Sequence, residues 1–154
     1  MNVHYFYGGP FSQWVECSFT DAVGVTYNST EQYMMAHKAL LMNDHDMYSK
    51  IMESNDPRTI KYAYGRNVKN FDQKLWDEHK FDIVYQGNLL KFSQNTYYRN
   101  YLINTGDTII VEASPTDTIW GIGLSIEDAV RGLGWRGENL LGKAIMKVRE
   151  KISP

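Results

Sequence analysis

Residues 28–42, NSTEQYMMAHKALLM, organise the chain, because two capping-box patterns overlap in this stretch. Asn28 is followed three residues later by Glu31, and Ser29 is followed in the same way by Gln32. A short polar side chain at an N-cap accepts a hydrogen bond from a free N–H group of the first turn. Either Asn28 or Ser29 can therefore begin a helix, which is expected to run to about Met42.

The residues before this helix predict short strands and turns. Val3–Tyr7 is an extended run rich in rings, and Gly8-Gly9-Pro10 is a turn signal that ends it. Cys17–Thr20 and Val25–Tyr27 flank a four-residue loop, Asp21–Gly24, and this pattern is typical of a hairpin.

The residues after this helix predict further helices and one strand. The expected helices are residues 46–53, a segment from Asp56-Pro57 to Gly65, residues 72–92, a segment that Asn95 caps and Gly106 closes, and residues 139–152. Thr108–Ala113 is rich in β-branched residues and predicts a strand, whereas residues 126–134 are interpreted as a loop. The fold class is therefore α+β, a mostly helical compact domain with a small β-sheet.

Length and composition exclude several classes of protein. The chain has 154 residues, which is enough for one domain over residues 1–154 but not for two. A net charge of −2 gives no general footprint for nucleic acid or anionic membrane, and one cysteine excludes a disulfide framework. No apolar run approaches the ~18 residues of a membrane span, and the N-terminus lacks a signal-peptide pattern. We expect a soluble cytoplasmic domain without a metal site.

Aromatic residues are unusually frequent for a chain whose mean hydropathy is −0.45. They make up 14% of the residues, with eleven tyrosines and four tryptophans. Rings of this size either fill the core or line a site for a flat ligand, and composition leaves both interpretations open.

Glu31 and Lys38 form the first candidate site. Seven residues are nearly two helical turns, so the two side chains share one face of the predicted helix. In one interpretation both face water while Met34 faces the core. In the other, Glu31 is a carboxylate at a helix N-terminus and Lys38 is a partly desolvated lysine that acts as a base or a Schiff-base nucleophile.

The end of the predicted strand supplies a second candidate site. Glu112 and Asp117 flank a proline turn, and Trp120 precedes a short Gly121-Ile122-Gly123 loop. Glycine lets backbone N–H groups approach a phosphate closely, although this pattern alone is also found in structural turns.

The segment before the last helix supplies a third candidate site. Residues 131–139, RGLGWRGEN, combine two arginines, three glycines and a tryptophan ahead of a helix N-terminus. Such an arrangement can hold a phosphate, with Arg136 and the first N–H groups of the helix as donors. A flexible loop with solvated arginines is the alternative.

Taken together, these stretches resemble one known family over nearly the whole chain. The matching blocks are Phe6–Trp14, Ser29–Met34 with Lys38, Gly65-Arg66, Trp76, Lys91-Phe92 with Gln94-Asn95, Val111–Pro115, Asp117, Trp120–Leu124, and Asn139–Gly142 with Met146 and Arg149. In this order they resemble the NADAR (NAD and ADP-ribose) family, also called YbiA-like.

The resemblance implies a YbiA-like fold and an N-glycosidase that hydrolyses the bond between ribose C1′ and a base nitrogen. The Trp135-Arg136-Gly137 block is more similar to members that remove ADP-ribose from guanine bases, in DNA or in nucleotides. Other members cleave ribosylaminopyrimidine 5′-phosphates of the riboflavin pathway. A domain that binds ADP-ribose or NAD without turnover is a third possibility. The partner is accordingly an ADP-ribose-containing or phosphoribosyl substrate, with ADP-ribosylated DNA as one form of it.

The resemblance also implies roles for individual residues. The expected catalytic residues are Glu31, Lys38 and Asp117. The expected substrate-binding residues are Tyr7, Gly8, Trp76, Glu112, Trp120, Gly121, Arg136 and Asn139. Glu31 supplies the carboxylate and moves the proton, while Lys38 either attacks C1′ of a ring-opened sugar or orients phosphate. No cofactor and no metal are needed for this chemistry.

Overall fold

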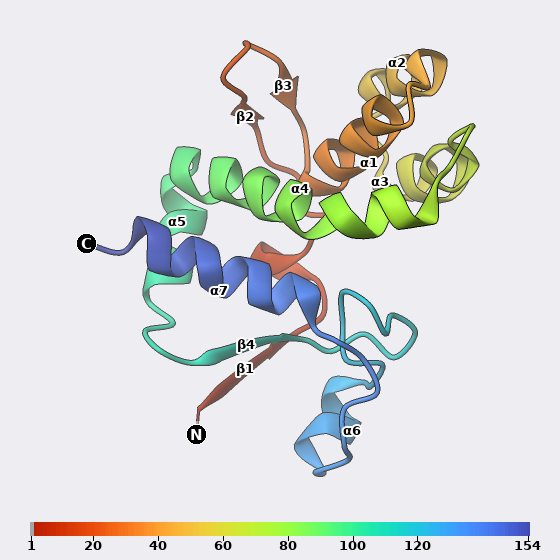
Figure 1. The fold of residues 1–154 in the computed structure, drawn as a ribbon. Coiled ribbons are helices and arrows are strands. Elements are labelled where there is room, and N and C mark those ends of the chain that lie inside the picture. The colour runs from red at the N-terminus through yellow and green to blue at the C-terminus, as the bar shows by residue number, and fades with distance from the viewer. Residues whose placement is uncertain (1) are drawn as a thin grey trace.

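The first and fourth strands form a parallel pair that joins the N-terminus to the last third of the chain. The computed structural model describes residues 2–154. Strand β1 (Val3–Phe6) pairs with β4 (Ile109–Glu112), so that Val3 lies opposite Ile109 and Phe6 opposite Glu112 (Figure 1). This register places the end of β4 beside the turn that follows β1.

The predicted hairpin is confirmed, with shorter strands than expected. Strand β2 (Phe19–Thr20) pairs antiparallel with β3 (Thr26–Tyr27). The side chain of Asp21 holds the turn, because its Oδ1 accepts hydrogen bonds from the N–H groups of Val23 and Val25.

The helix predicted at residue 28 or 29 begins after Ser29. Helix α1 spans Thr30–Leu41, and Ser29 Oγ accepts a hydrogen bond from Gln32 N at 3.0 Å. The Gln32 side chain reaches back, and its Oε1 accepts the N–H of Asn28 at 2.8 Å. Both halves of a capping box are therefore present, with Ser29 as the N-cap.

The segment between residues 45 and 67 is helical but irregular. Helix α2 (His45–Glu53) is followed by α3 (Pro57–Thr59), a π-helical turn η2 (Ile60–Tyr64) and a 3-10 turn η3 (Gly65–Asn67). One helix ending at Gly65 was expected, and the structure instead divides it. A Cβ atom at Gly65 would collide with Met35 of α1, so glycine permits the close approach of the two segments.

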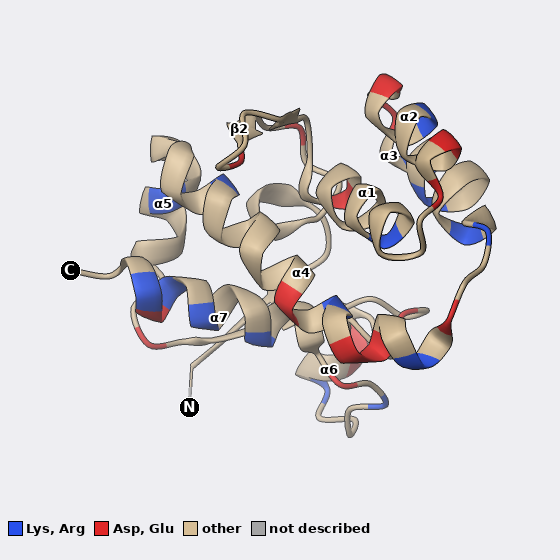
Figure 2. Cartoon of the chain, turned by 45° about the horizontal axis from the view of Figure 1, so that its top comes forward, with Lys and Arg blue, Asp and Glu red and all other residues tan. Residues whose placement is uncertain are grey.

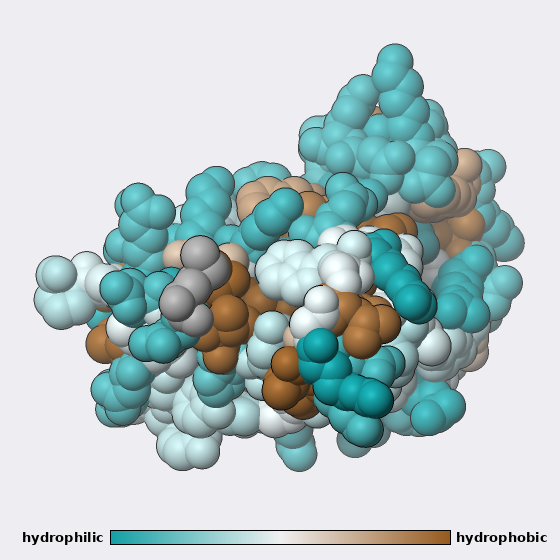
Figure 3. Space-filling model, turned by 90° about the horizontal axis from the view of Figure 1, so that it is seen from below, coloured by the Kyte–Doolittle hydropathy of each residue, from teal (hydrophilic) through white to brown (hydrophobic). Residues whose placement is uncertain are grey.

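The remaining helices form the centre of the molecule. Helix α4 (Gln73–Gln94) contacts α1 on one side and α7 (Leu140–Ile152) on the other, and α7 in turn contacts β4 (Figure 1). Helix α5 (Thr96–Ile103) follows α4 directly. Seen from below, apolar patches of the surface lie among hydrophilic side chains (Figure 3). No helix of residues 2–154 has both the length and the hydropathy of a membrane span.

Helix α6 (Ile126–Val130) lies in the segment that was interpreted as a loop. Its N-cap is Ser125, whose Oγ accepts the N–H of Asp128. Ala129 packs into a small second core with Val111 and Ile122, separate from the main core. The helix is therefore held by this contact more than by its own five residues.

Candidate active site

Glu31 is a buried carboxylate in the first turn of α1. Only 2% of its surface is exposed. Its backbone N–H donates to Gln13 O at 2.9 Å, which brings the following residue, Trp14, beside it. The indole N–H of Trp14 donates to Glu31 Oε1 at 3.0 Å, while Oε2 has no partner. A buried acceptor without a partner costs stability, which is typical of a group that meets its partner in a ligand.

Opposing influences act on the pKa of Glu31. Burial raises it to about 6, and the negative charge of Asp117 acts in the same direction. The Trp14 hydrogen bond and the positive charges of Lys61 and Lys38 lower it. Glu31 is therefore mostly ionised at neutral pH and becomes protonated in mild acid.

Glu112, at the end of β4, is a second carboxylate with an unpaired buried oxygen, Oε2. Burial and the charges of Asp117 and Glu31 raise its pKa to about 7, whereas Lys61 lowers it. Glu31 and Glu112 come from distant parts of the chain, and the β1–β4 register and α1 bring them within electrostatic range. Two carboxylates with different raised pKa values are suited to opposite proton-transfer roles.

Asn139 positions Glu112 instead of contacting solvent. It is almost completely buried, and its backbone is left-handed with φ of 54°. Its Nδ2 donates to Ile110 O at 3.0 Å, and its Oδ1 accepts the N–H of Glu112 at 3.0 Å. The side chain was expected to bind substrate, but both of its polar atoms are already used by β4. A side chain at Gly142 would collide with this arrangement.

The N-terminus of α7 is closed to an anion. The N–H groups of Asn139, Leu140 and Leu141 donate to the carbonyl groups of residues 121, 119 and 120, respectively, each at 3.1 Å. These three N–H groups are bonded to the preceding loop, which contradicts the expectation that they hold a phosphate, whereas the phosphate contact expected of Arg136 stays a prediction. Arg136 is exposed on that loop and its own N–H donates to Ile122 O.

Asp117 and Gly121 shape the loop after β4. Asp117 Oδ1 accepts the N–H groups of Ile119 at 2.9 Å and Trp120 at 2.8 Å, which is a turn-forming role. Its charge still raises the pKa of both glutamates. A Cβ atom at Gly121 would lie 3.0 Å from the carbonyl oxygens of Asp117 and Glu112, so glycine is needed for the close packing of this loop, and the approach of a phosphate to its N–H stays a prediction.

Lys38 is held between rings and is only partly exposed. Its Nζ donates to Gly65 O at 2.8 Å and lies 4.8 Å from the ring centroid of Phe71 and 5.6 Å from that of Trp76. Burial lowers the pKa of Lys38, which the charge of Glu31 partly offsets. The interpretation in which Glu31 and Lys38 both face water is therefore wrong. Trp76 is buried in the core and presents its ring to Lys38.

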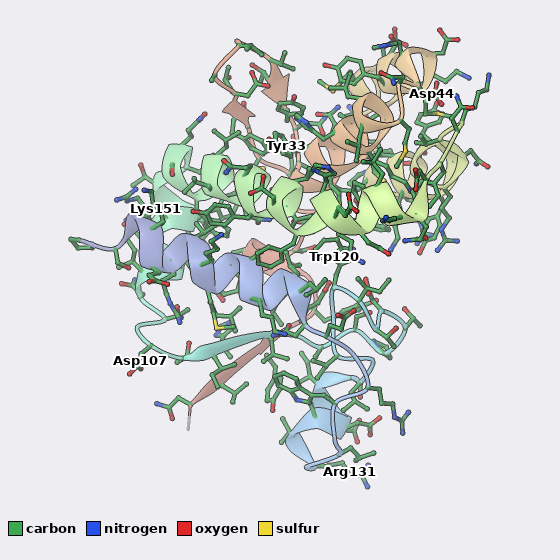
Figure 4. All side chains as sticks on the ribbon, in the orientation of Figure 1. Tyr33, Asp44, Asp107, Trp120, Arg131 and Lys151 are labelled. Carbon is green, nitrogen blue, oxygen red and sulfur yellow. The ribbon has the colours of Figure 1, made fainter. Side chains whose placement is uncertain are left out.

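The remaining predicted residues lie at the edge of this region or pack beside it. Tyr7 is 65% exposed, and Gly8 has φ of 88°, in the turn directly after the Phe6–Glu112 pair. Trp120 is partly buried and packs against the main core (Figure 4). Arg131 lies at the outer end of the molecule in the same view, well away from Trp120.

Comparison with known proteins now identifies the family. The sequence model of the NADAR domain matches residues 5–153. The chain belongs to the NADAR family. It is 52% identical over 147 residues to the protein named N-glycosidase R617 of Acanthamoeba polyphaga mimivirus, with 92% of this chain and 86% of that protein covered. It is also 34% identical over 128 residues to an N-glycosidase of Nostoc punctiforme, covering 82% of this chain and 76% of that protein.

Two further similarities concern the fold and the wider family. The NMR structure of Escherichia coli YbiA superposes with a TM-score of 0.81 at 24% identity, covering 99% of this chain and 85% of YbiA. This match confirms the predicted YbiA-like α+β fold. The riboflavin biosynthesis protein PYRR of Zea mays is 29% identical over 133 residues, which are 82% of this chain but 20% of that protein.

Sequence reasoning placed two residues of this NADAR site outside the candidate set, Trp14 and Lys61. Trp14 belongs to a block that carried the family resemblance, yet nothing in the sequence indicated its bond to Glu31. Lys61 lies in the π-helical turn, and its charge lowers the pKa of both Glu31 and Glu112. The sequence offered one indication of Lys61, its position shortly before Gly65-Arg66, which belong to a matching block of the family. The π turn alters the helical spacing, so this position does not by itself predict which side chains lie near Lys61.

Two surface hollows lie away from these carboxylates. One of about 500 Å³ is bordered by Asp107, Lys143 and Arg149, and another of about 350 Å³ by Asp44, His45 and Lys69. Neither hollow is bordered by Glu31, Glu112 or Lys38. Among residues 2–154, no three His, Cys, Asp or Glu side chains are grouped closely enough to hold a metal ion.

Proposed function

We propose that this NADAR protein is an N-glycosidase that hydrolyses the bond between ribose C1′ and a base nitrogen. The observation that carries the proposal is the pair of carboxylates, Glu31 and Glu112, each with a raised pKa and a buried oxygen without a partner. The names of the mimivirus and Nostoc relatives support the same reaction class.

The surroundings of the two carboxylates favour different roles. Glu31 lies in the first turn of α1 and accepts the Trp14 N–H, and both features favour its ionised form, whereas Glu112 lies beside the negative charges of Asp117 and Glu31. Breaking the C1′–N bond builds positive charge on the sugar, and a nearby ionised carboxylate stabilises that charge. Glu31 has the lower pKa, about 6, and supplies the negative charge at neutral pH. Glu112, with a pKa of about 7, is present in both forms and can give a proton to the leaving nitrogen. The proton transfer that was expected of Glu31 is thus assigned to Glu112, and Asp117 tunes both groups.

Lys38 allows a second chemical route. A lysine whose pKa is lowered by burial has more of the neutral amine that attacks a carbonyl carbon. In the ring-opened sugar C1′ is joined to the base nitrogen as an iminium carbon, and addition of the neutral Lys38 Nζ to C1′ gives an aminal. Transfer of a proton from Nζ to the base nitrogen then breaks the C1′–base bond and leaves a Lys38–sugar imine, which water hydrolyses to the free sugar and the amine. Borohydride reduces such an imine, so a mass increase on a peptide containing Lys38 supports this route, and its absence during turnover favours direct attack by water.

For the substrate, we propose ADP-ribose linked to a guanine base, in DNA or in a nucleotide. The block around Trp135 and Arg136 supports this choice through its resemblance to guanine-directed members of the family. Ribosylaminopyrimidine 5′-phosphates are the second candidate, because two kinds of relative carry riboflavin biosynthesis in their names. A module that only binds ADP-ribose or NAD has no need for two unpaired buried carboxylates. The free Cys17 is compatible with the reducing cytoplasm as the place of action.

The test follows release of free base from both substrates by the intact protein. We expect release from ADP-ribosylated guanine, and a loss of at least 100-fold in kcat for Glu31→Gln and Glu112→Gln (a general acid or base contributes roughly 10²–10⁴-fold). Glu138→Gln, at an exposed position, is the matched control and should retain activity. No release from either substrate by folded protein would overturn the proposal. Full activity of Glu31→Gln would remove that residue from the mechanism.

A further inference from the structure

We infer that Arg58, Lys61 and Arg66, gathered about the rings of Tyr62 and Trp14, bind the phosphate groups attached to the 5′ side of the substrate ribose. These five side chains form a basic cluster. The inference rests on the proposed function, because it assigns the phosphate-bearing arm of that substrate to a place beside the carboxylates.

The geometry joins the five side chains into one surface. Tyr62 is 41% exposed, and the charged groups of Arg66, Lys61 and Arg58 lie 4.4, 5.3 and 5.9 Å from its ring centroid. Arg58 and Lys61 also lie 6.0 and 5.9 Å from the ring of Trp14, which packs edge-on against Tyr62. Aromatic faces favour such cations but leave their N–H groups free to bind oxygen atoms.

The π-helical turn accounts for this convergence. A π turn closes hydrogen bonds over five residues instead of four, and the N–H of Gly65 donates to Ile60 O as well as to Lys61 O. Residues five apart then lie on one side, so Lys61 and Arg66 both reach the ring between them. Isolated π turns are frequently found at functional sites.

The positive charge of the cluster is not neutralised within the protein. Among residues 2–154, the ion pairs join Lys80 to Asp77 and Arg131 to Glu127, and no carboxylate lies within 4.0 Å of the three cations. The neighbouring Asp56 uses its oxygens on the N–H of Arg58 and the hydroxyl of Thr59. Figure 2 shows basic and acidic residues interspersed over most of the helices, with a further basic stretch along α7.

Trp14 connects the cluster directly to the reaction centre. Its indole N–H donates to Glu31, while its ring lies against Arg58 and Lys61. Lys61 also acts on the charge of both Glu31 and Glu112, and Arg66 acts on Lys38. A phosphate bound here would therefore lie one indole ring away from Glu31, the carboxylate proposed to act at C1′. The N-terminus of α7, the other place considered for a phosphate, has its donors occupied.

Binding experiments without turnover test the inference separately from catalysis. Calorimetry is performed with three probes: ADP-ribose, ribose 5-phosphate and ribose. We expect the double variant Arg58→Gln/Arg66→Gln to bind ADP-ribose at least tenfold more weakly, and to lose much of the dependence of its Kd on salt. Lys151→Gln, at an exposed lysine in the last turn of α7, is the control for removal of a surface cation and should bind like the wild type.

The probes distinguish one phosphate from two. If the losses for ADP-ribose and ribose 5-phosphate are equal, the cluster holds the phosphate next to ribose. A loss for ADP-ribose alone places the distal phosphate there, and both results support the inference. Unchanged affinity of the double variant for both phosphate probes overturns it, as does a wild type that binds neither. Phosphate binding lost in the variant of a protein without glycosidase activity would leave the inference standing and remove the proposed function.

Kinetics give a second readout. With a substrate that carries phosphate, the double variant should raise KM at least tenfold and change kcat by less than threefold. With a phosphate-free nucleoside N-glycoside, its kcat/KM should equal that of the wild type. A loss of kcat/KM on both substrates would indicate damage to the carboxylate site and contradict a role in phosphate binding.

Discussion

Replacing Trp14 with phenylalanine tests whether the indole N–H holds Glu31 in its ionised form. The substitution keeps an aromatic ring at this position and removes the donor to Glu31 Oε1 at 3.0 Å. Because that hydrogen bond favours the carboxylate, its removal must raise the pKa of Glu31 above its value of about 6. The variant is therefore less ionised at neutral pH than the wild type.

The size of the effect follows from the strength of such bonds. A hydrogen bond to a charged group contributes about 1.5–3 kcal/mol, and one pKa unit corresponds to about 1.4 kcal/mol. The pKa of Glu31 should therefore rise by roughly 1–2 units, to or above the pKa of about 7 of Glu112. At pH 7 the ionised fraction of Glu31, and the rate with it, should therefore fall roughly 2- to 10-fold relative to the wild type. Most of this deficit relative to the wild type should disappear at pH 8.5.

The measurement is the pH dependence of kcat/KM with the substrate that the wild type hydrolyses. Glu31 and Glu112 interact, so the profile reports apparent pKa values of the pair, and the prediction is that its acid limb moves upward by about one unit or more. Tyr97→Phe, at an exposed tyrosine of α5, is the control and should leave the limb in place. A rate that falls equally at every pH would refute the reasoning, because it would show that Trp14 acts through packing alone.

Three further predictions concern stability. Asn139→Ala leaves the backbone groups of Ile110 and Glu112 without partners, and should lower the free energy of unfolding by about 2–4 kcal/mol in urea titrations; a change below 0.5 would contradict the bonding described. Gly142→Ala places a methyl group against the Asn139 side chain and should cost about 1–3 kcal/mol, seen as a lower Tm. Burial lowers the pKa of Lys91 from 10.5 to about 8, so the unfolded chain binds more protons between these values and stability should rise with pH there. Lys91→Met should abolish that rise, and an unchanged pH dependence would refute it.

The elements that could be predicted from sequence are those with local signals. The capping box of Ser29 and Gln32 involves residues close together in the sequence, so it can be recognised without knowing the tertiary fold. The apolar residues of the last helix likewise recur at spacings of three and four. Helix α6 could not be predicted in this way, because five residues have little helical stability of their own and Ala129 packs against strand β4. The π turn likewise depends on contact between Gly65 and Met35, which lie far apart in the sequence.

In the candidate site, too, the features that could be predicted are local in sequence, and those that could not depend on contacts between distant segments. Helical spacing was enough to place Glu31 and Lys38 on one face of α1. Asp117 was expected to be catalytic and Glu112 to bind substrate, whereas we propose that Glu112 donates the proton and Asp117 tunes both glutamates. The reason lies in the loop after β4, where one Asp117 oxygen accepts the N–H groups of the turn and one Glu112 oxygen has no partner. Asn139 occupies a left-handed conformation whose bonds to β4 no sequence pattern announces.

The partners of the two carboxylates explain why a buried acid is useful here. A permanent arginine partner would stabilise ionised Glu31 in the resting protein as well, and an interaction that is equally strong before and during the reaction does not lower the barrier. Glu31 instead has a neutral donor, Trp14, and a free oxygen, and the charges of Lys61 and Lys38 act without forming an ion pair with it. Such a carboxylate gains most when positive charge appears on a neighbouring sugar. Arg58 and Lys61 lie against the ring of Trp14, so one indole ring stands between them and Glu31. A phosphate bound to them would neutralise their charge and so weaken their electrostatic attraction for Glu31 as the substrate binds.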